Sequence, residues 1–302
     1  MKRLLLIYNA SAGRQKVKTM LPDILDVFAR EGWLTTVVPT QARGDAARAA
    51  AALGAAFERL VCCGGDGTLN ETASGLMQLH PSMRPVLGYI PTGTTNDFSR
   101  NLSLPRGTEE LAGTACGGVP RYIDLGRAGE RWFTYVAAFG LFTDVSYTTP
   151  QNVKNLLGHT AYLIEGASRL ASVQSYAMRV ESGDRTVEGE FIYGMVGNTV
   201  SVGGLLNLPQ DLVKLDDGQF EVLLVRKPQT ALEFQTIVHT LLNQKREAGE
   251  PDNGLVLCFA ADQVTFTCQE AVPWTLDGEF GGEHQTLRVE NHQRSLVLAC
   301  GT

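Results

Sequence analysis

Three short segments that combine glycine with hydroxyl or amide side chains carry the clearest chemical signal in this sequence. They are NASAG at 9–13, GGDGTLNE at 64–71 and PTGTTNDFSR at 91–100. Glycine lets the backbone approach a phosphate closely, and a helix that begins there adds a partial positive charge. Together the three segments predict a cradle for nucleotide phosphates. Taken singly, each is also typical of a helix cap, and Thr68-x-x-Glu71 has the spacing of a capping box.

The second segment places an acidic residue, Asp66, among the glycines. A carboxylate there would repel phosphates unless a Mg²⁺ lies between them, or unless the carboxylate takes a proton from an acceptor hydroxyl. A turn aspartate without a chemical role is the alternative. The sequence contains neither a Walker A loop nor the G-x-G-x-x-G motif of dinucleotide-binding proteins, so neither kind of site is expected.

The elements around these segments alternate between strand and helix patterns. Apolar runs at 3–8, 33–39, 59–63 and 85–90 predict buried parallel strands, and helices are expected at 17–28, at 44–57, from about Thr68 and from about Asn96. Ligands bind at the carboxyl ends of the strands in open parallel sheets, so the three segments are expected to share one edge. The segment 103–119 is the expected hinge.

The pattern changes near residue 120 to many short strands separated by turn residues, at 176–181, 186–197, 219–226, 255–260, 263–268, 274–277 and 285–290. One helix is expected at 153–167 and another near 230–243. The last run, SLVLAC at 295–300, is expected to return to the first half. We therefore expect an α/β protein with an N-terminal parallel-sheet nucleotide-binding domain (1–125), a C-terminal β-sandwich-like domain (126–294) and a final strand within 295–302.

Composition limits the class of protein. The 302 residues are 44% hydrophobic, enough to bury a core, and the net charge of −6 argues against a protein that coats nucleic acid. No stretch approaches the length needed to span a bilayer. Six scattered cysteines predict reduced, buried thiols in a cytoplasmic protein, and the five histidines have no metal-binding spacing.

GGDGTLNE and PTGTTNDFSRNL together resemble the lipid kinase superfamily of soluble bacterial diacylglycerol kinases, eukaryotic diacylglycerol kinase catalytic domains and sphingosine kinases. The resemblance extends over essentially the whole chain, through YNASAGR near the start, KLDDGQFEV at 214–222 and LDGEFGG at 276–282. GGDGT alone is shared with NAD kinases and 6-phosphofructokinases. Three other elements are more specific to the lipid kinase superfamily: P-x-G-T-x-N-D-F, D-D-G-x-F and D-G-E. Their order along the chain adds to that specificity.

The resemblance implies an ATP- and Mg²⁺-dependent lipid kinase. The residues that it assigns to the nucleotide are Asn9, Ala10, Ser11, Ala12, Gly13, Thr40, Gly65, Asp66, Gly67, Thr68, Leu69, Asn70, Glu71 and Thr94. It implies a Mg²⁺ held by the Asp217 side chain and the backbone carbonyls of Lys214 and Gln219, although D-D-G alone predicts a hairpin turn.

A catalytic carboxylate is also implied. Glu279 is expected to act as general base, with Asp277 as the alternative and Asp66 as a second catalytic carboxylate. Asp277-Gly278 is equally typical of a plain turn. Glu165 departs from the pattern, because close bacterial relatives carry a lysine there that is linked to the metal network. The reversed charge puts that part of the network in doubt.

Diacylglycerol is the expected acceptor, which would give phosphatidate. Phosphatidylglycerol, a sphingoid base or NAD as acceptor, and a non-catalytic nucleotide- or lipid-binding protein, are the alternatives. A lipid substrate implies that a cytoplasmic protein docks transiently on a membrane surface. Because the net charge is negative and does not favour anionic membranes, a local basic or apolar patch would have to make the contact. A homodimer is the default expectation for the assembly.

Overall fold

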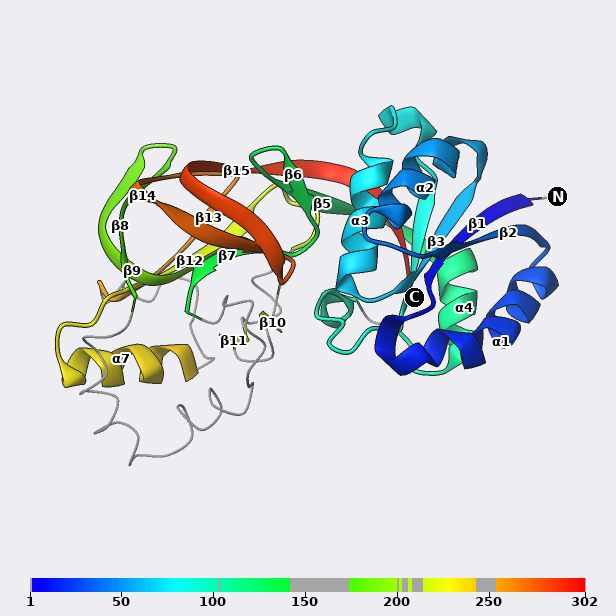
Figure 1. The fold of residues 1–302 in the computed structure, drawn as a ribbon, viewed down its shortest axis with the longest axis horizontal. Coiled ribbons are helices and arrows are strands. Elements are labelled where there is room, and N and C mark those ends of the chain that lie inside the picture. Colours follow the sequence, from blue (N-terminus) through cyan, green and yellow to red (C-terminus); the bar gives the residue numbers. More distant parts are fainter. Residues whose placement is uncertain are drawn as a thin grey trace.

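We describe the protein from a computed structural model, which covers residues 2–102, 104–141, 174–199, 201–202, 206–207, 214–242 and 254–301. The chain has a mixed α/β fold (Figure 1). Among these residues, no helix has the length and apolar character needed to cross a membrane. All six cysteines are free; four are buried as expected, whereas Cys258 is exposed and Cys268 is half-buried.

The N-terminal half is built on four parallel strands in the order β4-β3-β1-β2. They are β1 (Lys2–Asn9), β2 (Trp33–Thr40), β3 (Arg59–Gly64) and β4 (Val86–Pro91). The helices are α1 (Lys16–Arg30), α2 (Asp45–Leu53), α3 (Asp66–Leu76) and α4 (Thr108–Gly117). Alternate residues of β1 point to opposite faces of the sheet. Leu5 and Ile7 pack against α2 and α3 on one face, and Leu4 and Leu6 pack against α1 and α4 on the other. Figure 1 shows the helices on these two faces. This explains the continuous apolar run.

One predicted helix of this half is wrong, and a different one is present. The chain after Asn96 forms only a 3-10 turn, Phe98–Asn101, and α4 lies within the segment 103–119 that was expected to be a hinge. Pro105 disfavours a helix that continues from the turn, because proline disfavours helical backbone in the residue before it and lacks an N–H. Gly107 then occupies the N-cap of α4.

The second half is rich in strands, as expected. They are β5 (Val119–Ala128), β6 (Arg131–Phe133), β7 (Val136–Gly140), β8 (Tyr176–Ser182), β9 (Arg185–Gly197), β10 (Ser201–Val202), β11 (Leu206–Asn207), β12 (Phe220–Arg226), β13 (Val256–Ala261), β14 (Gln263–Leu276) and β15 (Glu279–Cys300). The expected helix near 230–243 is α7 (Ala231–Leu242). The helix expected at 153–167 lies outside the described residues.

The strands of both halves belong to one sheet, from which only the β10–β11 pair is separate among the described residues. Runs predicted as separate strands are continuous: 263–268 with the run that begins at 274 in β14, which ends at Leu276, and 285–290 with 295–300 in β15. Register shifts at Thr267/Val272 and His292/Leu296 let these strands bend without ending. Phe139, Phe266 and Trp274 pack ring against ring in the core of this half.

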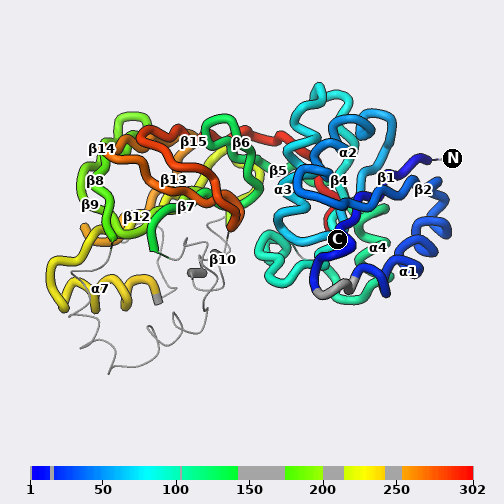
Figure 2. The backbone as a smooth tube through the Cα atoms, viewed as in Figure 1, coloured from blue at the N-terminus to red at the C-terminus, as the bar shows by residue number. Residues whose placement is uncertain are grey.

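β15 is the strand that joins the halves. It pairs with β14 and β5, and its end returns to the N-terminal half, where Leu298 pairs in parallel with Leu87 of β4. Figure 2 shows this return, with the C-terminus among the first strands. β15 therefore begins at Glu279, the last residue of the LDGE segment, and ends beside β4 in the parallel sheet.

Candidate active site

The three glycine-containing segments lie at one edge of the parallel sheet. Asn9 is level with Thr40 across β1 and β2, and Gly64 is level with Pro91 across β3 and β4. Since Tyr8 also pairs with Cys63, all four strands end at about the same height. The shared edge predicted from the sequence is confirmed, and Thr40 lies on it at the end of β2.

The first segment contacts both of the others. The Asn9 Nδ2 donates to the Thr68 Oγ1 at 3.4 Å, and the Asn9 Oδ1 accepts from the Ser11 N–H at 2.9 Å. Gly13 has a φ of +52°, and a Cβ there would collide with the carbonyl oxygen of Thr92. Residues 9–13 are thus held as a tight turn against the third segment, and only glycine fits at its end.

Asp66 ties the second segment to the third. Its two carboxylate oxygens accept the backbone N–H groups of Asp97 (3.0 Å) and Phe98 (3.2 Å). Burial raises the pKa of Asp66 to about 6, although those two hydrogen bonds favour the charged form. Its observed role is to position the third segment. Thr94, in the same segment, is exposed.

The helix after the glycines begins at Asp66 rather than at Thr68, so the capping-box interpretation is wrong. Glu71 instead accepts the backbone N–H groups of Gly44 (2.7 Å) and Ala46 (3.3 Å) at the start of α2. Leu69 is buried in the core. The side chains of Leu69 and Glu71 therefore hold the fold together, and any contact that they make with a nucleotide stays a prediction.

Asp277 is a buried anchor of the LDGE turn. It is 5% exposed, and its carboxylate accepts the N–H groups of Thr134 (2.6 Å), Tyr135 (2.9 Å) and Val136 (3.1 Å). It also accepts the Thr134 hydroxyl (2.7 Å) and the Asn70 Nδ2 (2.7 Å). Burial raises its pKa, against the effect of these hydrogen bonds. With five donors around its two oxygens, this carboxylate is fully occupied as a structural acceptor.

Glu279 lies two residues further on, across a two-residue hairpin turn, and its environment is different. Its side chain is 45% exposed, and a Cβ built on Gly67 would lie 2.7 Å from its Oε1. The carboxylate therefore lies directly beside the glycine segment. The turn needs the positive φ values of Asp277 (+51°) and Gly278 (+79°), so the plain-turn interpretation of this dipeptide is correct and compatible with a role for Glu279.

The Glu279 Oε2 also accepts a 2.6 Å hydrogen bond from Arg43, which sequence reasoning did not single out. Arg43 belongs to a loop whose backbone is held by Asp45, which accepts the N–H groups of Gln41 and Ala42 at 2.7 Å each. No local spacing signals this pair, since its two residues are far apart in the sequence.

The predicted metal segment forms a turn whose hydrogen bonds lead to β5 and β15. The Asp217 Oδ1 accepts the Gln219 N–H at 3.0 Å, and Lys214 and Asp217 are exposed. A second carboxylate, Asp124 of β5, accepts the N–H groups of Gly218 (2.7 Å) and Arg294 (2.7 Å). Sequence reasoning missed Asp124, because a single aspartate within a strand carries no local signal.

No group of three or more His, Cys, Asp or Glu residues in the described part of the chain is arranged to hold a metal ion. A cation at the D-D-G turn would therefore depend on backbone carbonyls and water as well as on Asp217. Glu165, at which the sequence departs from the family pattern, lies outside the described residues, so its relation to the turn stays a prediction.

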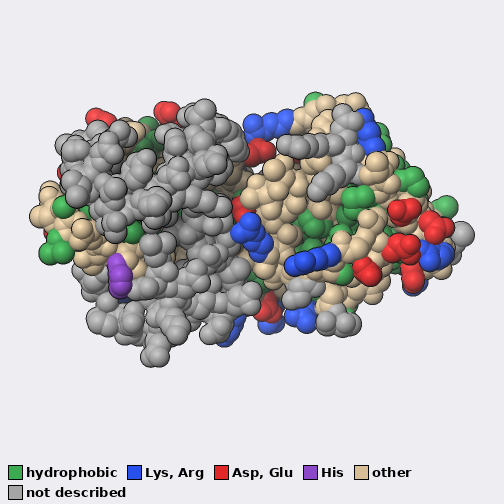
Figure 3. Space-filling model, turned by 90° about the horizontal axis from the view of Figure 1, so that it is seen from below, with side chains coloured by type: hydrophobic (Ala, Val, Ile, Leu, Met, Phe, Trp, Pro, Cys, Tyr) green, Lys and Arg blue, Asp and Glu red, His purple; other side chains and the backbone are tan. Residues whose placement is uncertain are grey.

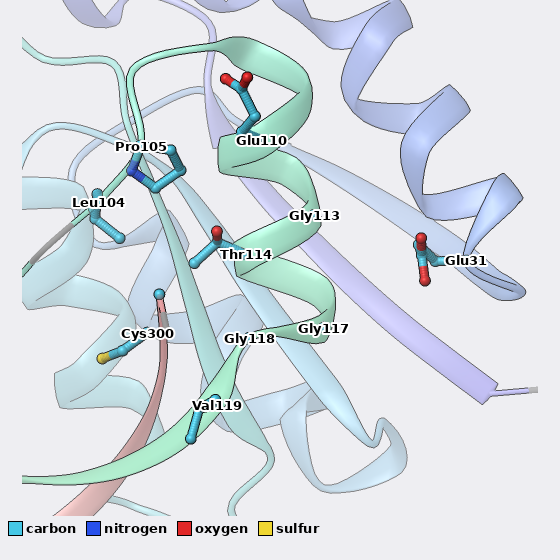
Figure 4. A pocket seen from close by; sticks show the side chains of 11 residues that line it. Glu31, Leu104, Pro105, Glu110, Gly113, Thr114, Gly117, Gly118, Val119 and Cys300 are labelled. Atoms are coloured by element: carbon cyan, nitrogen blue, oxygen red, sulfur yellow. The ribbon is translucent and has the colours of Figure 1, made fainter.

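An open pocket of about 750 Å³ lies elsewhere, beside α4. Figure 4 shows Glu110 and Thr114 of α4, Val119 of β5 and Cys300 of β15 around it. None of the residues predicted to bind nucleotide or metal lines this pocket. It therefore does not contribute to the candidate active site.

Comparison with known proteins identifies the family of this chain. A family model described as the diacylglycerol kinase catalytic domain matches residues 3–128. Diacylglycerol kinase of Bacillus subtilis (strain 168) is 36% identical over 288 residues, which cover 93% of this chain and 91% of the relative. Diacylglycerol kinase of Staphylococcus carnosus (strain TM300) is 35% identical, over 93% of this chain and 90% of the relative.

Solved structures share the whole fold. A candidate diacylglycerol kinase from Bacillus anthracis str. Sterne superposes with a TM-score of 0.78 at 25% identity, over 99% of this chain and 95% of the other. A second structure from the same organism gives a TM-score of 0.75 at 22% identity and supports the fold alone. From the identity and coverage of its relatives, the chain belongs to the diacylglycerol kinase family, which is a family of lipid kinases.

Proposed function

We propose that this protein transfers the γ-phosphoryl group of ATP to the hydroxyl of diacylglycerol and so produces phosphatidate. The observation that carries the proposal is the position of Glu279, whose carboxylate lies beside Gly67 of the glycine segment. A phosphate cradle and a solvent-accessible carboxylate in contact are what phosphoryl transfer to an alcohol requires.

In this reaction the acceptor oxygen forms a bond to the γ-phosphorus while the bond from that phosphorus to the β,γ-bridging oxygen breaks. The acceptor proton passes to Glu279, and ADP leaves. Backbone N–H groups of residues 9–13 and 64–67 would bind the phosphates, as expected at the carboxyl edge of a parallel sheet. Asp277 supports the reaction indirectly, because it fixes the turn that carries Glu279.

We propose Mg²⁺ as the metal and keep Lys214, Asp217 and Gln219 as its ligands. The oxygen donors of this turn, one carboxylate and backbone carbonyls, suit a hard cation that retains several waters. When bound, Mg²⁺ neutralises phosphate charge. Asp124 holds the turn in place through Gly218 and Arg294.

The proposed layout places ATP on the N-terminal half (1–125) and the lipid on the strand-rich half (126–294), with the reaction between them. We further propose that the enzyme is cytoplasmic and docks on membranes transiently. On the face shown in Figure 3, Lys and Arg side chains alternate with Asp and Glu over the coloured N-terminal half. Docking there would depend on a local patch rather than on a broad basic surface. The homodimer stays a prediction.

The test is a phosphorylation assay with labelled ATP and separate acceptors: diacylglycerol, phosphatidylglycerol, a sphingoid base and NAD. We expect labelled phosphatidate as the main product, and preference for another acceptor would replace the substrate assignment. Glu279→Gln is expected to lower kcat by about 100-fold or more. Glu283→Gln, an exposed neighbour on β15, is the matched control and should leave kcat unchanged. An unmodified protein that phosphorylates none of these acceptors would refute the proposal.

A further inference from the structure

Arg43 connects the loop after β2 to the carboxylate that we propose as the base. Its Nη2 donates to the Glu279 Oε2 at 2.6 Å, so the N-terminal half and the strand-rich half meet at this pair. The pair is open to solvent, with 68% of the Arg43 side chain and 45% of the Glu279 side chain exposed. The carboxylate that an acceptor has to reach is therefore already bonded to a cation.

The loop that carries Arg43 is attached to the helix of the second glycine segment. Glu71 of α3 accepts the N–H of Gly44, the next residue along the chain, at 2.7 Å. On the other side, Asp45 accepts the N–H of Ala42 at 2.7 Å. The guanidinium therefore extends toward the strand-rich half from a backbone that carboxylates hold on both sides.

The Glu279 carboxylate has a neighbour at each of its oxygens. The Oε1 faces Gly67, where a built Cβ would lie 2.7 Å away, and the Oε2 accepts the hydrogen bond from Arg43. A general base must present an oxygen lone pair to the hydroxyl whose proton it takes. An acceptor that transfers its proton to the Oε2 must therefore first displace the guanidinium.

Water and a lipid differ in what they bring to this exchange. Water always surrounds an exposed carboxylate, and a water molecule makes no further contacts that could offset the loss of the ion pair. A lipid also contacts the protein through its glycerol esters and acyl chains. Binding energy from such non-reacting parts of a substrate can be used to assemble the reacting groups, and this separates a good acceptor from a small competitor.

We propose that Arg43 is a positioning residue that makes the base available to a lipid hydroxyl and withholds it from water, an inference that rests on the proposed function. Without lipid, Arg43 holds the Glu279 carboxylate. When the lipid binds, its hydroxyl replaces the guanidinium at the Oε2. If water took that place, its oxygen would bond to the γ-phosphorus while the bond from that phosphorus to the β,γ-bridging oxygen breaks. The proton would pass to Glu279, and ADP and inorganic phosphate would leave.

The experiment measures ADP release without lipid, at saturating ATP, in the unmodified protein, Arg43→Ala and Arg43→Lys. We expect Arg43→Ala to raise this rate about fivefold, because an exposed ion pair withholds the carboxylate by roughly that factor. Arg43→Lys keeps the charge and should stay within about twofold of the unmodified protein. The KM for ATP should stay unchanged. The KM for diacylglycerol in detergent mixed micelles should fall in Arg43→Ala, because the hydroxyl no longer competes with the guanidinium.

Three controls show whether the effect passes through the base. The double variant Arg43→Ala/Glu279→Gln should lose the raised hydrolysis, because water then has no base. Arg30→Ala also removes exposed ion pairs, with Asp26 and Glu109, but at the end of α1 away from the glycine segments, and it should leave hydrolysis unchanged. Potassium chloride at about 0.5 M screens exposed pairs, so it should raise hydrolysis by the unmodified protein but not by Arg43→Ala.

The outcomes separate this inference from the function on which it rests. If the unmodified protein phosphorylates diacylglycerol and Arg43→Ala hydrolyses ATP no faster, the inference is wrong. A higher KM for ATP in Arg43→Ala also overturns it, because Arg43 then binds the nucleotide. Raised hydrolysis that persists in the double variant overturns it as well, because the effect then bypasses Glu279. An unmodified protein without lipid kinase activity refutes the proposed function itself, whatever the variants do.

Discussion

The two carboxylates of the LDGE turn should respond to mutation in opposite ways. In Asp277→Asn, an amide nitrogen replaces one carboxylate oxygen and faces backbone N–H groups, which can only donate. If that oxygen is Oδ1, the bonds from Tyr135 (2.9 Å) and Val136 (3.1 Å) are lost. Each buried donor left unpaired costs roughly 1–3 kcal/mol, so we expect a loss of about 4 kcal/mol in the free energy of unfolding. That is a large fraction of the stability of an ordinary domain.

Glu279→Gln removes an ion pair whose side chains are 45% and 68% exposed. Such pairs contribute about 0–1 kcal/mol, so stability should barely change while kcat falls by about 100-fold or more. Urea denaturation followed by circular dichroism, together with single-turnover kinetics, measures both quantities. The reasoning fails if Asp277→Asn unfolds at the same urea concentration as the unmodified protein but is inactive, while Glu279→Gln remains active. That result would make Asp277 the base.

Three further predictions follow from the glycine segments. The pKa of Asp66 is higher in the folded protein than in the unfolded chain, so this group stabilises the fold fully below its ordinary pKa, and that stabilisation is lost as pH rises from about 4 to about 6. Urea denaturation across this pH range should therefore show a decrease of roughly 3 kcal/mol in the free energy of unfolding, and Asp66→Asn should not show it. Gly13→Ala should raise the KM for ATP by about tenfold, because the added Cβ meets the Thr92 carbonyl at a positive φ; an unchanged KM would exclude this segment from nucleotide binding. Arg43→Ala should change the free energy of unfolding by less than about 1 kcal/mol, since its ion pair with Glu279 is exposed, and a larger loss in thermal denaturation would contradict that view.

Local patterns in the sequence predicted the four strands of the N-terminal half and the edge that carries the glycine segments. Continuous apolar runs are buried on both faces of the strands, and the glycine segments follow them, so the shared edge could be inferred without coordinates. The helix expected after Asn96 failed for a local reason, because Asn96 itself has a φ of +51° and Pro105 follows soon after. Neither is compatible with a helix that continues through this region.

The groups that sequence reasoning missed are those whose partners are distant in the chain. Asp124 meets Gly218 and Arg294, and neither contact follows from spacing along a strand. Arg43 meets Glu279 across the boundary between the two halves, a contact that no local pattern displays. The D-D-G and L-D-G-E segments drew attention through family resemblance, because alone they predict only turns.

The unbroken course of β15 also affects how the enzyme is made. The strand carries Glu279 at its start and pairs with β4 near its end. The pairing that connects the two halves of the sheet therefore forms between segments that are far apart in the sequence. During synthesis, β4 leaves the ribosome long before its neighbour exists, and one of its edges stays unpaired in the meantime. Pairings of this kind form slowly, and exposed strand edges promote association between nascent chains. The position of Glu279 is therefore among the last features of the molecule to be established.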